Sequence, residues 1–198
     1  MGLTLAFDTA TSIATSALVA DGEVLGERAS QPLRVLADVD ELLREAGAEP
    51  RELDRIVVGT GPGSFTGIRV GLAAARTLAL ALDAPLAGVS TLDALAAGAP
   101  DATPVIDGGR REVFALLGDG PSVLSPEELS LEAGAVCVGD GAVRYRAVLE
   151  AVGLNVPPDE DERHLPRARF HARLASEFGS PDAVEPVYLR VPDAEARR

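Results

Sequence analysis

The glycine-rich segment GTGPGSFTGIRVG, residues 59–71, is the strongest candidate for a binding site in this sequence. It follows an apolar run typical of a buried strand and leads into a long apolar stretch typical of a helix. A glycine turn from strand to helix often brings backbone N–H groups close to a phosphate. An aspartate at the end of the first apolar run could then orient a hydrated magnesium ion beside that phosphate. The candidate phosphate or nucleotide contacts are Asp8, Thr9, Gly61, Gly63 and Ser64.

A purely structural role for the same residues is an open alternative. The chain contains no lysine, whereas a P-loop needs one to neutralise the terminal phosphates. The dinucleotide fingerprint also fails, because Gly67 comes one residue too late after Gly61 and Gly63. Glycines also permit a tight turn and close packing of a helix on a strand. Asp8 at the end of a strand suits an Asx turn with its own backbone equally well.

The sequence offers no residues for hydrolytic chemistry or for a zinc site. His164 and His171 are the only histidines, and they lack the i, i+4 spacing of a helical zinc-binding pair. Ser64 does not lie in the G-x-S-x-G pattern of a nucleophile elbow. Cys137 is the only cysteine, which excludes an internal disulfide, and its apolar neighbours predict a buried thiol. We therefore expect neither catalytic residues nor a metal site.

The charge balance argues against unaided binding of nucleic acid. Thirty-one acidic residues give the chain a net charge of −13 at pH 7, so it repels a phosphate backbone. No uninterrupted apolar run reaches the roughly 18 residues that span a bilayer. The N-terminus has the pattern of a strand and lacks the positive region of a secretory signal. We expect a cytoplasmic globular protein without membrane contact.

The order of predicted elements indicates an α/β fold. Three strands open the chain, and Asp21-Gly22 predicts a tight hairpin turn between the second and the third. A helix over about 34–46, a buried strand, the glycine loop and a helix to about Leu82 follow. Ser90 can cap a further short helix.

From residue 104 the layout of the N-terminus repeats. A strand ending in Asp107 is followed by a polar turn, a second strand and an Asp-Gly pair, as after Asp8. Such internal repetition predicts two lobes that share one basic fold. The topology matches the two-lobed actin-like and Hsp70-like (ASKHA, ribonuclease H-like) architecture, with mixed sheets flanked by helices and here a reduced second lobe. We expect a first lobe at 1–99 and a smaller second lobe at 100–198, whose final segment from about 184 packs back on the first lobe.

The stretch from Val57 to Ala96, VVGTGPGSFTGIRVGLAAARTLALALDAPLAGVSTLDALA, resembles the bacterial tRNA threonylcarbamoyladenosine biosynthesis family TsaB, also called YeaZ and once classed as glycoprotease-like. The start LAFDTATS, the segment VIDGGRREVFALL and the closing PVYLR fit the same pattern. The segment ASQPLRVLADVDELL departs from it, because it is short and lacks a histidine often found there. The resemblance therefore covers most of the chain.

This resemblance implies a non-catalytic subunit with an actin-like fold. Members of the family support a catalytic homologue, TsaD, together with an ATPase, TsaE, and form homodimers in isolation. The complex modifies adenosine 37 of tRNAs that read codons beginning with A. The resemblance implies that this chain needs no cofactor of its own, that ATP is used by the assembled complex, and that tRNA is contacted indirectly.

The helix from about Gly67 to Leu82 has a second apolar face, which predicts a subunit interface. A monomer's surface helix would be polar there. A cation at Arg69 in the first turn opposes the helix dipole, so we expect its partner to come from outside the chain. The predicted interface comprises Arg69, Leu72, Ala73, Arg76 and Leu80. The alternative function is an autonomous small-molecule kinase or ATPase of the same architecture, whereas a protease is disfavoured by the missing metal and triad residues.

Overall fold

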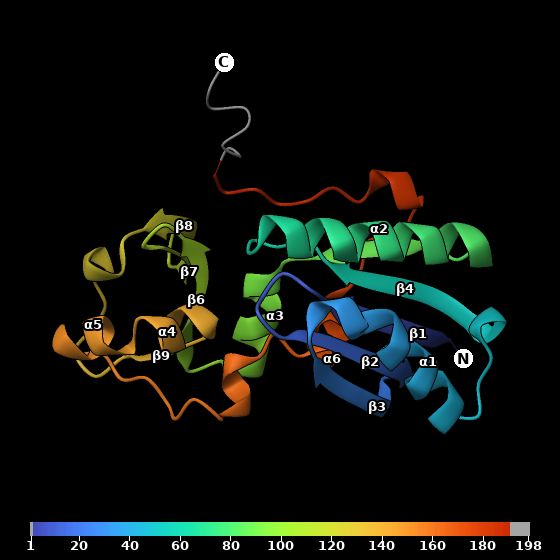
Figure 1. The fold of residues 1–198 in the computed structure, drawn as a ribbon, viewed down its shortest axis with the longest axis horizontal. Helices are drawn as coiled ribbons and strands as arrows, with labels where there is room; N and C mark the ends of the chain where they lie inside the picture. The colour runs from blue at the N-terminus through green and yellow to red at the C-terminus, as the bar shows by residue number, and fades with distance from the viewer. Residues whose placement is uncertain (1, 191–198) are drawn as a thin grey trace, which may run out of the picture.

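The computed structural model describes residues 2–190 and has two lobes, each built on one sheet (Figure 1). The first sheet has the strand order β3-β2-β1-β4-β5. Its strands β1, β2 and β3 form an antiparallel meander, while β1, β4 and β5 run parallel to one another. The five strands are β1 (Leu3–Asp8), β2 (Ala14–Ala20), β3 (Glu23–Ser30), β4 (Leu53–Gly59) and β5 (Leu86–Val89).

Helices cover both faces of the first sheet. Alternate residues of β1 and β4 point to opposite sides, so Phe7 and Val58 meet α1 and α2, whereas Ala6 and Val57 meet α6. A fourth helix, α3, lies between the sheets and begins at the predicted cap, where the Asp93 N–H donates to the Ser90 hydroxyl. The helices are α1 (Val35–Glu45), α2 (Phe65–Leu82), α3 (Thr91–Gly98) and α6 (Ala168–Leu174).

The second lobe is smaller and repeats the opening hairpin of the first. Its sheet has the order β8-β7-β6-β9, with β6 antiparallel to β7 and parallel to β9. Buried Val105, Val113 and Leu149 belong to its own core. The elements are β6 (Ala102–Gly109), β7 (Glu112–Leu117), β8 (Gly120–Leu124), β9 (Val136–Val138), α4 (Asp140–Arg144) and α5 (Arg146–Ala151). Short 3-10 helices occupy Pro32–Arg34, Pro50–Glu52, Pro126–Glu128, Glu162–His164 and Pro181–Ala183.

The chain returns to the first lobe earlier than the sequence suggests. The small residues Ala168 and Ala172 let α6 pack closely on the second face of the first sheet, well before residue 184. Residues 184–190, which we call the C-terminal strap, then run along α2 (red in Figure 1) and reach the second lobe, where Arg190 pairs with Glu112. The helix α6 ends at Leu174.

The longest helix, α2, is apolar enough to span a bilayer by length and composition alone. Arg69 and Arg76 nevertheless interrupt it, so it is not an uninterrupted apolar run of the length that spans a bilayer. A core helix passes the same test, and the inner side of α2 lies in the first lobe's core through Ile68, Leu72, Ala75 and Ala79. The apolar composition of α2 is explained on that side by packing on the sheet.

Candidate functional site

The glycine loop approaches the chain's own first turn. The Ser64 N–H donates to the Ala10 carbonyl at 2.7 Å, and the Thr9 hydroxyl donates to the Gly67 carbonyl at 2.7 Å. A Cβ atom at Gly63 would lie 2.3 Å from the Ala10 oxygen, and one at Gly67 would lie 2.1 Å from the Thr9 oxygen. No other residue type fits these contacts, so both glycines serve the packing of α2 against the β1–β2 turn.

Asp8 is sealed beneath this turn. Its carboxylate is fully buried and accepts hydrogen bonds from the Ala10 N–H at 2.6 Å, from the Thr91 hydroxyl at 2.7 Å and from His171 Nε2 at 2.8 Å. A Cβ at Gly59 would fall 2.2 Å from the same carboxyl group. Burial acts to raise the pKa of Asp8, but the hydrogen bond and charge of His171, with the bonds from Thr91 and Ala10, lower it below 3.8.

The first turn does not fit the nucleotide phosphates and magnesium of an actin-like ATPase. Asp8 and Thr9 are buried with their side chains engaged, and Gly61 is buried with its carbonyl bonded to the Thr91 N–H. The prediction that these three contact phosphate is therefore wrong, since no surface ligand can reach them. Gly63 and Ser64 do line a cavity, and Ser64 caps α2 by accepting from the Gly67 N–H.

The second hairpin is held to the first by Asp140 rather than by a ligand. One carboxylate oxygen of Asp140 accepts from the Asp107 N–H at 3.0 Å and the other from the Ser12 N–H at 3.2 Å. Burial raises the pKa of Asp140, and the two backbone bonds partly oppose that rise. Asp107 itself lies nearer the surface and pairs with Arg144 at 2.8 Å. The two turns that would face each other across phosphates are therefore linked by one partly buried side chain.

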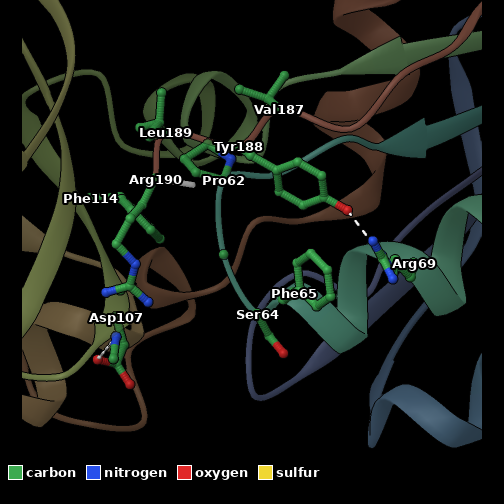
Figure 2. Close-up of a pocket in the computed structure, with 13 residues that line it drawn as sticks. Pro62, Ser64, Phe65, Arg69, Asp107, Phe114, Val187, Tyr188, Leu189 and Arg190 are labelled. Atoms are coloured by element: carbon green, nitrogen blue, oxygen red, sulfur yellow. Dashed lines mark hydrogen bonds between the residues drawn. The ribbon is translucent and has the colours of Figure 1, made fainter. Parts of the chain in front are cut away.

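A cavity of about 590 Å³ lies between the glycine loop, the second hairpin and the C-terminal strap (Figure 2). Its charged groups are satisfied within the chain. Arg69 Nε donates to the Tyr188 hydroxyl at 3.3 Å while its guanidinium lies 3.9 Å from the centre of the Phe65 ring, and Arg190 pairs with Glu112. The lining residues are Pro62, Gly63, Ser64, Phe65, Arg69, Asp107, Gly108, Gly109, Phe114, Val187, Tyr188, Leu189 and Arg190.

The predicted interface residues on α2 fall into three groups. Leu72 is buried in the first lobe's core, so its placement at an interface was wrong. Arg69 and Arg76 bind the strap, through the Tyr188 hydroxyl and the Val184 carbonyl, so the partner of Arg69 comes from inside the chain and not from outside. Ala73 and Leu80 are exposed, and 66% of Leu80 is accessible. These two remain as interface candidates.

The sequence did not identify the side chains that bind Asp8 and link the two hairpin turns. Thr91, Asp140 and His171 come from three distant segments and received no functional assignment. The only available signal was the layout of Asp140, which follows a strand and a glycine as the helix begins. Cys137 is buried as predicted, and burial raises the pKa of its thiol to about 11. Within residues 2–190 no cluster of three metal-binding side chains forms.

The sequence is similar to proteins named for the synthesis of threonylcarbamoyladenosine in tRNA. The family model for TsaD, tRNA N6-adenosine threonylcarbamoyltransferase, matches residues 26–138. An uncharacterised protein of Mycobacterium tuberculosis is 34% identical, over 96% of this chain and 93% of the relative. The tRNA threonylcarbamoyladenosine biosynthesis protein TsaB of Bacillus subtilis is 29% identical, over 98% of this chain and 96% of the relative.

The solved structures agree with the actin-like architecture predicted from the sequence. YeaZ from Pseudomonas aeruginosa superposes with a TM-score of 0.75 at 28% identity, covering 96% of this chain and all of the other. The activator of the 2-hydroxyisocaproyl-CoA dehydratase from Clostridium difficile, with bound ADPNP, has a TM-score of 0.50 at 14% identity, over 86% and 92% of the two chains. The second likeness concerns the fold alone. The fold prediction is confirmed.

Proposed function

Because this chain belongs to the TsaB (YeaZ) family, we propose that it is a non-catalytic, cytoplasmic subunit of the machinery that forms N6-threonylcarbamoyladenosine in tRNA. In this role it binds and supports a catalytic homologue of the TsaD type, with an ATPase of the TsaE type in the same assembly. Alone, it pairs with itself. It requires no cofactor of its own, and ATP is used by the assembled complex.

The closed first turn is the observation that carries the non-catalytic role. In an actin-like ATPase this turn must receive phosphate, whereas here α2 fills the space with contacts that only glycine permits at Gly63 and Gly67. Asp8 is the residue that would orient a metal. Both of its carboxylate oxygens instead accept hydrogen bonds, from the Ala10 N–H, the Thr91 hydroxyl and His171 Nε2. A subunit without chemistry of its own must act through contact with another protein.

The outer surface of the two long helices supports such a contact. Leu80 and Ala73 are exposed on α2, where a surface helix would normally carry polar side chains. On α1, which covers the same face of the sheet, Leu36 is 52% accessible, and Leu33 in the turn just before α1 is 88% accessible. The exposure of Leu36 adds apolar surface to this side of the lobe. Exposed apolar surface of this kind marks protein interaction sites.

The charge of the chain supports an indirect role toward tRNA. A net charge of −13 opposes the approach of a phosphate backbone. We therefore expect tRNA to bind mainly to the partner subunits.

The test is association with the TsaD homologue of the same organism. Ala73→Glu and Leu80→Glu place a charge on exposed positions of α2, so they should abolish co-elution with the homologue in size-exclusion chromatography with light scattering. Both variants should keep the wild-type circular dichroism spectrum and melting temperature, because neither side chain lies in the core. Modification of tRNA by the reconstituted complex should fall in parallel.

The matched control is Ala151→Glu, which adds the same charge at an exposed position of α5 in the second lobe. It should associate as the wild type does. Normal assembly of both α2 variants, or their outright unfolding, would show that this face has been assigned wrongly.

A further inference from the structure

The second face of the first sheet is only partly covered. The helix α6, which covers this face, has seven residues and packs on Ala6, Ala17 and Val57. Toward the start of β1 the sheet is open and forms a groove of about 470 Å³. We call this the arginine groove; its lining residues are Gly2, Thr4, Val19, Asp21, Gly22, Val24, Arg55, Arg169, Phe170, Ala172 and Arg173. It lies on the opposite side of the sheet from α1 and α2.

The charges of this groove are unusual for the protein. Among residues 2–190, Arg55 and Arg173 are the two arginines whose side chains make no hydrogen bond or ion pair, and both line the groove. The third, Arg169, is held by Glu27 at 3.0 Å. In a chain with 31 acidic residues, arginines find carboxylates easily. Two unpaired guanidinium groups in one groove therefore indicate a site for carboxylates or phosphates from another molecule.

Aromatic rings hold these guanidinium groups in place. Arg55 lies 5.2 Å from the centre of the Phe178 ring, while Arg169 and Arg173 lie 5.1 and 5.4 Å from that of Phe170. A cation over a ring loses part of its rotamer freedom before any ligand arrives. Such ordering lowers the entropy cost of binding an anion.

The floor of the groove favours a polypeptide over a nucleic acid. Val19, Val24, Ala172 and Phe170 supply apolar surface between the arginines. A phosphate backbone has no apolar side chains to bury there and meets repulsion from the whole chain. A short acidic segment carries less charge and can place leucine or phenylalanine side chains on the floor while its carboxylates meet the guanidinium groups.

We propose that the arginine groove binds an acidic, amphipathic segment of a partner protein. This site is independent of the α2 surface and does not rest on the proposed function. Its failure would leave association with the TsaD homologue untouched, so the two proposals fail separately.

The test uses a random twelve-residue peptide library displayed on phage, panned against the full chain. Selected peptides should be rich in Asp and Glu interspersed with large apolar residues. By fluorescence polarisation, the double variant Arg55→Ala/Arg173→Ala should bind these peptides at least tenfold more weakly, because both free cations are lost. Binding by the wild type should also weaken as salt rises.

The matched control is Arg44→Ala/Arg51→Ala, which removes two exposed arginines that pair with Asp40 and Glu49 on other surfaces. It should bind the peptides as the wild type does. Equal peptide binding by both double variants, or no enrichment of acidic sequences, would overturn the proposal. Binding of a twelve-nucleotide single-stranded RNA through the same two arginines would assign the groove to phosphate instead. A concentration-dependent dimer that only Arg55→Ala/Arg173→Ala disrupts would assign it to a second copy of the chain.

Discussion

Removal of the His171 side chain should strongly destabilise the fold, because it breaks a buried pair with Asp8. His171 and Asp8 are both inaccessible to solvent, and their contact of 2.8 Å joins α6 to the end of β1. His171→Ala would leave the Asp8 carboxylate buried with only two neutral donors, from Ala10 and Thr91. Breaking a buried pair by removing one partner costs about 3–5 kcal/mol. In a protein of this size that corresponds to a fall in melting temperature of about 6–20 °C.

The pH dependence of this loss has a definite sign. In the wild type the pKa of Asp8 lies below 3.8, so its stabilising effect is fully present above pH 3.8 and is lost as the pH falls through the lower folded value. Without His171, burial is left to raise the pKa of Asp8 in the folded state. The variant then becomes less stable as the pH rises from 3.8 through the raised folded pKa of Asp8. The difference in unfolding free energy between wild type and His171→Ala should therefore be larger at pH 7.5 than at pH 5.

The assay is urea unfolding followed by circular dichroism, with two comparisons. His164→Ala removes a buried histidine whose partners are the Gly139 N–H and the Pro157 carbonyl, so it should cost less, about 1–3 kcal/mol. Asp8→Asn removes the charge, so it should partly rescue His171→Ala. If His171→Ala lowers the unfolding free energy no more than His164→Ala, and Asp8→Asn gives no rescue, then the buried Asp8–His171 pair does not stabilise the fold.

Four further outcomes follow from the same contacts. Gly71→Ala should lower stability by about 1–3 kcal/mol in urea unfolding, although alanine normally favours a helix interior, because its Cβ would lie 2.3 Å from the Thr9 hydroxyl; a stabilised variant would contradict this packing. Asp140→Ala should speed amide hydrogen exchange at Ser12 and Asp107 but leave the β1 and β4 amides protected, since it removes only the link between the turns. The Cys137 thiol, with a pKa of about 11, should react with a disulfide reagent at pH 8 only as fast as the protein unfolds. The purified chain should hydrolyse ATP at well below about 1 per second, the ordinary enzyme range, and a faster rate would favour the kinase or ATPase alternative.

The parts of the fold that follow from local rules could be predicted from the sequence. Asp21 and Gly22 both adopt positive φ angles, as a two-residue hairpin turn requires, and this pair is recognisable in the sequence. The end of α2 at Leu82 and the cap at Ser90 depend on nearby residues in the same way. The exposure of Leu36 was not predictable by periodicity, because its position beside the inner stripe of α1 depends on how the helix is rotated on the sheet.

The candidate site was harder to predict because its partners are distant in the chain. His171 reaches Asp8 across 163 residues, and Tyr188 reaches Arg69 across 119. Charge and helix-dipole arguments correctly mark Arg69 as a residue that needs a partner, but they do not say where that partner lies. Here the strap supplies it from within the chain.

Asp8 and Asp107 lie at equivalent places in the two repeated hairpins, yet they have different surroundings. Repetition in the sequence therefore predicts the topology but not the chemical role of each residue. Asp8 ends β1, Asp107 lies two residues before the end of β6, and each accepts a hydrogen bond from the N–H two residues later. Asp8 is covered by α6 and α3, which bring His171 and Thr91 to it, so its carboxylate becomes part of the core. Asp107 lies beside the cavity and meets Arg144 instead. Whether such an aspartate can hold a metal therefore depends on what packs over the turn, and in this chain the helix that follows the glycine loop already occupies that space at the first turn.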